Sequence, residues 1–120
     1  MQAEELKDIV VDALDDLKAT DITVIDVRDK SSITDIIVVA TGGSNRQVKG
    51  LADHVSVMAK DNGVQRLSIE GADAGEWVLV DLGDVVVHVM QARVREFYQL
   101  ERLWEMPAVD SSATDEDDAG

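Results

Sequence analysis

The 120-residue chain has no cysteine and few aromatic residues, four in all. Without cysteine it has no disulfide framework, no thiolate nucleophile and no zinc site built on sulfur. No apolar run approaches the roughly 18 residues of a membrane span. The acidic, amphipathic segment at residues 1–17 lacks the basic start of a signal sequence and the arginines of a transit peptide. The sequence therefore predicts a soluble, cytoplasmic protein with a single core.

Positive charge is also scarce, because 11 Lys and Arg residues stand against 25 Asp and Glu residues, for a net charge of -14. A surface this acidic repels phosphate, which argues against general nucleic-acid binding and favours a basic partner. Five of the acids and no base follow Pro107, so residues 1–106 carry -9. Residues 107–120 are too polar to repay the entropy of ordering. We expect an ordered domain over residues 1–106 and a disordered acidic tail over residues 107–120.

Hydrophobic spacing predicts the order helix, strand, strand, helix, three strands, helix. Ser44 and Gln47 form a capping-box signature before the second helix, and Pro107 stops the last one. This order predicts an α/β sandwich, with a mixed five-stranded sheet and its long helices on one face. The expected elements are helices over residues 3–17, 45–60 and 94–106 and strands over residues 22–27, 35–40, 67–69, 77–82 and 85–90.

The last two strands flank Gly83-Asp84, a two-residue turn of the kind that tight hairpins use. If Leu82 pairs with Val85, alternation divides the hairpin into two faces. The aliphatic face is predicted to be core, whereas the mixed face meets either a third helix or something outside the domain. The aliphatic face holds Val78, Val80, Leu82, Val85, Val87 and Val89, and the mixed face holds Trp77, Leu79, Asp81, Val86, His88 and Met90.

The Gly-rich turn before the second helix is one candidate for a catalytic site. The Gly42-Gly43-Ser44 turn precedes a helix N-terminus that favours an anion, and a similar turn opens the active site of nucleotidyltransferases. Such an enzyme needs a close pair of metal-binding acids on the next strand, but Glu70 and Asp73 are separated by a turn. A plain turn and helix cap is therefore favoured over a nucleotide-handling enzyme, which stays the alternative.

The two histidines, His54 and His88, give no metal site, because His54 lies among solvated residues that offer no further ligands. His88 beside Asp81 has no credible nucleophile near it, so a structural hydrogen-bonded pair is favoured over a general base. No cofactor is predicted.

All four aromatic residues fall between Gly75 and Trp104, and large aromatic side chains dominate both cores and binding hot spots. Their spacing predicts that Phe97 and Leu103 clasp the last helix onto the sheet. For Trp77 and Tyr98, at the edges of their elements, core and partner surface are equally compatible with the spacing.

Several separated motifs, in order, closely resemble the ribosomal silencing factor family, also called the Iojap-related family. The resemblance covers nearly the whole chain from the first helix to Trp104. Its motifs are DITVIDV (21–27), TDIIVVATG (34–42), SNRQV (44–48), Glu70-Gly71, WVLVDLGDVVVHV (77–89) and REFYQLERLW (95–104).

The resemblance implies a non-enzymatic translation repressor with a fold like that of nucleotidyltransferases but without their active site. Family members bind the large ribosomal subunit through ribosomal protein L-fourteen and sterically block joining of the small subunit, in nutrient limitation or stationary phase. They tend to be homodimers when free. Carried over to this chain, the family pattern places the partner-binding surface at Trp77, Asp81, His88, Arg95, Tyr98, Leu100, Glu101 and Trp104.

Overall fold

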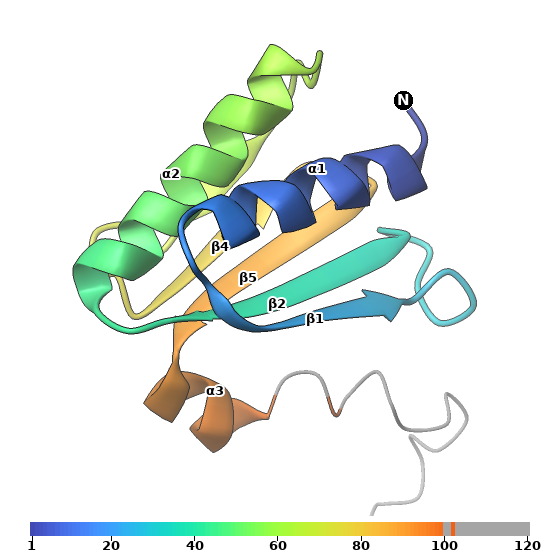
Figure 1. The fold of residues 1–120 in the computed structure, drawn as a ribbon. Coiled ribbons are helices and arrows are strands. Elements are labelled where there is room, and N and C mark those ends of the chain that lie inside the picture. The colour runs from blue at the N-terminus through green and yellow to red at the C-terminus, as the bar shows by residue number, and fades with distance from the viewer. Residues whose placement is uncertain (100–101, 103–120) are drawn as a thin grey trace, which may run out of the picture.

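The computed structural model describes residues 1–99 and 102. The element order agrees with the prediction, and the last helix is the shortest (Figure 1). The sequence predictions for the tail over residues 107–120, and for Leu100, Glu101, Leu103 and Trp104, lie outside the described residues. The elements are α1 (Ala3–Asp16), β1 (Thr20–Asp26), β2 (Ile36–Gly42), α2 (Asn45–Asp61), β3 (Ser68–Glu70), β4 (Trp77–Asp81), β5 (Val85–Gln91) and α3 (Ala92–Tyr98).

The five strands form one mixed sheet in the order β1-β2-β5-β4-β3. β2 and β5 are parallel, whereas the other three pairs are antiparallel. β2 and β5 are adjacent although α2, β3 and β4 separate them in the chain. At the hairpin, the Leu82 amide donates to the Val85 carbonyl at 2.9 Å, and Asp81 pairs with Val86. The predicted hairpin register is confirmed.

Both long helices pack on the same face of the sheet (Figure 1), as predicted. The six aliphatic residues predicted for this face of the hairpin are all buried in the main core, against Leu14 of α1 and Leu51 of α2. β2 is buried along its whole length. Among the described residues, no helix is long and apolar enough to span a bilayer.

The N-terminus of α2 follows the prediction in part. The Ser44 hydroxyl accepts a hydrogen bond from the Gln47 amide at 3.1 Å, but the Gln47 side chain accepts from the Gly43 amide, at 2.6 Å, rather than from that of Ser44. Gly42 is needed here because a Cβ would lie 2.9 Å from Cγ2 of Val48. The glycines let the end of β2 pass close to α2 and turn into it.

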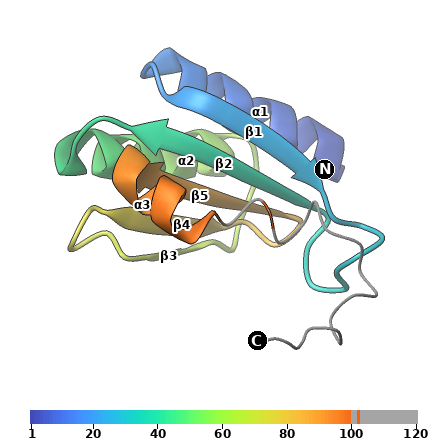
Figure 2. The same ribbon diagram turned by 90° about the horizontal axis from the view of Figure 1, so that it is seen from below.

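The opposite face carries α3 at one end (Figure 2). A second, smaller cluster lies here, in which Met90 and Val94 pack with apolar residues from the first two strands. α3 begins at Ala92, two residues before the predicted start, and a left-handed Gln99 (φ 48°) ends it. The predicted uninterrupted helix over residues 94–106 is therefore wrong at Gln99, because this backbone conformation breaks the helical hydrogen-bond ladder.

Candidate partner-binding site

Three aromatic side chains and the imidazole of a histidine form a row of rings on the face opposite α1 and α2. They come from β4, β5 and α3. The Trp77 ring centroid lies 5.9 Å from that of His88 and 5.0 Å from that of Tyr98. Phe97 meets Tyr98 edge to face at 4.9 Å. The row runs from the buried His88, 8 % exposed, to Phe97, which is 78 % exposed. We refer to His88, Trp77, Tyr98 and Phe97 as the aromatic row.

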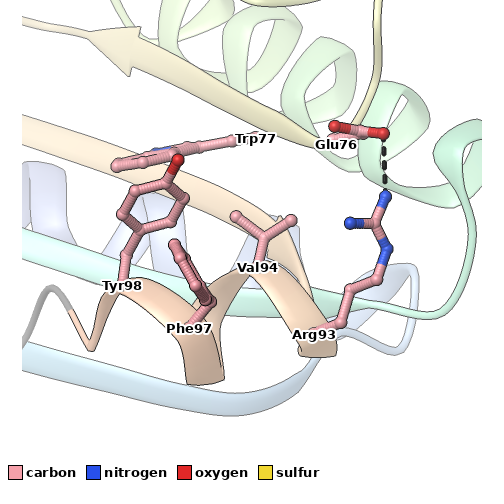
Figure 3. Close-up of a pocket in the computed structure, with 6 residues that line it drawn as sticks. All are labelled: Glu76, Trp77, Arg93, Val94, Phe97 and Tyr98. Carbon is pink, nitrogen blue, oxygen red and sulfur yellow. Dashed lines mark hydrogen bonds and ion pairs between the residues drawn. The ribbon is translucent and has the colours of Figure 1, made fainter.

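The exposed end of the row borders a cavity of about 520 Å³. Figure 3 shows Tyr98, Phe97 and Val94 rising from α3 toward the Trp77 side chain. At the rim, an Arg93 guanidinium nitrogen lies 2.8 Å from a carboxylate oxygen of Glu76, and both side chains are exposed, by 65 % and 49 %. The cavity thus combines apolar walls with one charged pair, which suits an amphipathic protein surface.

The backbone before β4 sets the position of Trp77. Gly71 has φ +87° and lies so close to Trp77 that a Cβ would stand 2.2 Å from its carbonyl oxygen. The Glu76 carbonyl accepts a hydrogen bond from the Gln91 amide at 3.0 Å, which extends the β4-β5 pairing by one residue. This extension places Glu76 beside the start of α3 and hence beside Arg93.

His88 holds the indole of Trp77 by a hydrogen bond. Nε1–H of Trp77 donates to Nδ1 of His88 at 3.0 Å. Burial lowers the pKa of His88 from 6.5 to about 4, so the imidazole is neutral near pH 7. Because Nδ1 accepts, the ring proton is on Nε2.

The predicted pairing of His88 with Asp81 is wrong, since the partner of His88 is Trp77. Asp81 lies at the other end of β4, where its carboxylate accepts a hydrogen bond from the Gly83 amide at 2.9 Å. This bond stabilises the tight turn, as Asp side chains often do. The Asp81 carboxylate is therefore bonded to the turn and not to His88.

Arg95 ties α3 to the first two strands. Its guanidinium donates to the Thr41 hydroxyl at 2.9 Å, the Thr23 hydroxyl at 2.8 Å and the Asp21 carbonyl. Asp21 has φ 50°, and the β1-β2 register shifts between Thr20 and Thr23, so an irregularity in β1 turns this carbonyl toward Arg95. Arg95 positions the helix that carries Phe97 and Tyr98.

Of the predicted partner-binding residues, the structure brings together Trp77, His88 and Tyr98. Arg95 lies on α3 but bonds to the first two strands and does not line the cavity. Tyr98 is 56 % exposed and Trp77 is half-buried, so both present ring surface to the solvent. Phe97, expected to clasp α3 onto the sheet, is exposed. Of the seven residues of α3 only Val94 is buried against the sheet, and the Phe97 ring packs on Tyr98 instead.

Glu76, Arg93 and Val94 line the cavity but were absent from the sequence prediction. The predicted hairpin register held a signal for two of them. Continuing it past Trp77 and Met90 sets Glu76 opposite Gln91, two residues from Arg93.

The Gly42-Gly43-Ser44 turn borders a separate cavity of about 450 Å³. The amide of Gly43 is bonded to Gln47, and the lining residues include no carboxylate. His54, the other histidine, lies 3.1 Å from a carboxylate oxygen of Asp16. Within residues 1–99 and 102, no group of three or more His, Cys, Asp or Glu side chains is placed to hold a metal ion. The lining of the cavity at the Gly42-Gly43-Ser44 turn thus lacks the paired acids that a nucleotidyltransferase needs.

One face of the sheet is aliphatic and covered by two helices, and the other carries the aromatic row beside its cavity, so the molecule is a small α/β domain with one exposed aromatic surface. The profile of the family described as "Ribosomal silencing factor during starvation" matches residues 1–119. The chain belongs to this ribosomal silencing factor family.

Individual relatives support the family membership. The chain is 48% identical over 104 residues to ribosomal silencing factor RsfS of Chromobacterium violaceum, which covers 87% of this chain and 85% of the relative. It is 46% identical over 99 residues to RsfS of Haemophilus influenzae, covering 82% and 97%. A crystal structure of a Chromobacterium violaceum protein superimposes with a TM-score of 0.86 at 44% identity, covering 96% of this chain and 98% of the other.

Proposed function

We propose that this chain is a ribosome-associated repressor of translation that acts by binding and not by catalysis. It binds the large ribosomal subunit through ribosomal protein L-fourteen and sterically blocks joining of the small subunit, chiefly under nutrient limitation or in stationary phase. It acts in the cytoplasm and is a homodimer when free. The observation that carries this proposal is the exposed aromatic row beside its cavity, in a member of the ribosomal silencing factor family.

The physical chemistry of the row suits this role. Tryptophan and tyrosine are the side chains most often found as anchors of protein interfaces, and 56 % of Tyr98 is available for contact. Arg93 and Glu76 can exchange their ion pair for polar contacts with a partner at the rim.

The charge of the chain adds selectivity to the site. With 25 acidic residues against 11 basic ones, the surface repels the phosphates of ribosomal RNA and attracts a basic protein. Electrostatic repulsion of this kind affects the choice of binding site more than the affinity.

Co-sedimentation with isolated large subunits tests the binding. Tyr98→Ala and Trp77→Ala should each weaken it by more than about 1 kcal/mol, as expected for anchors. The matched control is Ile33→Ala, which truncates a side chain that is 87 % exposed in the loop before β2, at the opposite end of that strand from α3. Wild-type protein that fails to sediment with large subunits at low salt would contradict the proposal.

Subunit joining, followed by light scattering, tests the mechanism. Wild-type protein should slow joining of the two subunits, whereas the Tyr98→Ala variant should do so only at higher concentration. If the protein binds large subunits but leaves joining unchanged, steric blocking is wrong. Capture of a basic protein that is not ribosomal, with no large-subunit binding, would identify an adaptor with another partner.

A further inference from the structure

We propose that His88 is a positioning residue, whose Nδ1 holds the Trp77 indole in the orientation that lets Trp77 and Tyr98 form the wall of the cavity. The effect of His88 on partner affinity rests on the proposed function, but its effect on the indole does not. This assignment differs from a contact residue, because His88 acts through Trp77.

His88 is largely buried and lies outside the cavity lining. The side chain is 8 % exposed, and Trp77 lies between it and Tyr98 in the aromatic row. A partner that fills the cavity meets Trp77, Phe97 and Tyr98, because these three rings line it and His88 does not. His88 therefore affects the shape of this cavity through Trp77.

The sheet register places His88 where it can hold the indole. Trp77 pairs directly with Met90, and His88 pairs with Leu79, so Trp77 and His88 are diagonal neighbours on the same face. Large side chains reach each other across such a diagonal. Here the contact combines the 3.0 Å hydrogen bond with a tilted ring contact, which fixes both the position and the rotation of the indole.

The orientation of the indole then determines the shape of the site. The Trp77 and Tyr98 ring planes meet at 49° with centroids 5.0 Å apart, and Tyr98 supports Phe97 at 86°. A rotated indole would remove the surface on which Tyr98 packs. The same hydrogen bond also satisfies the indole N–H, which would otherwise lose its partner against the sheet.

A double-mutant cycle separates positioning from a general contribution to stability. The variants are His88→Leu, Trp77→Phe and the double substitution, and binding to isolated large subunits is measured for each. Leucine cannot accept the hydrogen bond and phenylalanine cannot donate it. We expect His88→Leu to weaken binding at least about fivefold in the wild-type background and to have no further effect in the Trp77→Phe background.

Equal losses in both backgrounds would overturn the proposal, since they would show that His88 acts independently of Trp77. Two further variants control for folding and chemistry. His88→Gln supplies an acceptor oxygen and should recover part of the lost affinity. His88→Val replaces the leucine variant if that variant does not fold, because valine already occupies most positions of β5.

The indole N–H itself provides a readout that needs no ribosome. In a Trp104→Phe background, the ¹H–¹⁵N spectrum contains one indole signal, that of Trp77. We expect His88→Leu to move this signal and to speed its hydrogen exchange about fivefold, and His88→Gln to restore protection. An unchanged signal in the leucine variant would overturn the positioning role, whereas failure of the wild type to bind large subunits would overturn only the proposed function.

Discussion

The two faces of the sheet are built from the same strands but held together differently. On the face toward α1 and α2, β4 and β5 contribute only aliphatic side chains, all buried. On the other face the same strands contribute Trp77 and His88, and α3 covers one end through Val94. There the arrangement depends on directed hydrogen bonds from Trp77 and Arg95.

Under the proposed function, stability and recognition are assigned to opposite faces of the sheet. The helix-covered face contributes through non-directional burial of apolar area, so its residues affect mainly the free energy of unfolding. The face with the aromatic row buries less, and its directed contacts determine where exposed rings stand. Substitutions on the two faces should therefore separate in unfolding and in binding measurements.

The largest effect is expected for Leu51→Ala on the helix-covered face. Leu51 is fully buried in the main core, so its truncation removes apolar burial and leaves a cavity. Urea denaturation should show a loss of about 2 to 5 kcal/mol in the free energy of unfolding. The folded fraction should still bind large subunits with unchanged affinity. Val57→Ala, on the exposed side of α2, is the control and should stay within about 1 kcal/mol.

The second effect is a pH dependence of the free energy of unfolding, caused by His88 on the face with the aromatic row. The pKa of His88 is lowered from 6.5 to about 4 by burial, so unfolded chains bind more protons than folded ones between these values. This contribution to stability is present above pH 6.5 and is lost as the pH falls toward 4, by up to about 3 kcal/mol.

The His88→Gln variant isolates this contribution from that of the acidic residues. Chemical denaturation of both proteins at pH 7 and pH 4 should show the variant gaining on the wild type as the pH falls. A stability difference that stays constant over this range would show that His88 does not titrate with a lowered pKa.

The helix-covered face could be predicted from the sequence because alternation carries the information. A strand places every second side chain on the same side, so the six aliphatic positions around the Gly83-Asp84 turn identified a core face and a register together. The predicted boundaries of α2, Asn45 to Lys60, differ by one residue from the structure. Local signals, namely Ser44 and Asn62-Gly63, mark both ends.

The other face could be predicted only in part. Its residues Trp77 and Tyr98 were identified through the family resemblance, whereas spacing alone left core and surface open. The partners of Arg95 and Asp81 depend on backbone features that no periodicity encodes. For Arg95 the feature is the irregularity in β1, and for Asp81 it is the turn whose Gly83 amide the carboxylate accepts from. Phe97 was assigned to the core because large aromatic residues are often buried, but in the structure its ring packs on Tyr98 and is exposed.

A third prediction concerns Arg95, which ties α3 to the first two strands. Arg95→Met keeps the aliphatic stem but removes the hydrogen bonds to Thr23 and Thr41. We expect a loss of about 1 to 3 kcal/mol in stability, faster amide exchange throughout α3 and weaker binding to large subunits. Arg93→Met is the control for stability and amide exchange, because its exposed ion pair with Glu76 contributes at most about 1 kcal/mol. Equal losses of stability in the two variants would contradict a special role for Arg95.

The smallest effect on stability is expected for Phe97→Ser. Phe97 is 78 % exposed and touches the domain through the edge of Tyr98, so the free energy of unfolding should change by no more than about 0.5 kcal/mol. Binding to large subunits should weaken by more than about 1 kcal/mol if the ring contributes contact area. Ile33→Ser, 87 % exposed at the other end of β2, should change neither quantity. Thermal unfolding and co-sedimentation on the same samples measure both quantities. A loss of stability comparable to that of Leu51→Ala would show that Phe97 contributes to the core, and the contrast between the two faces would then be wrong.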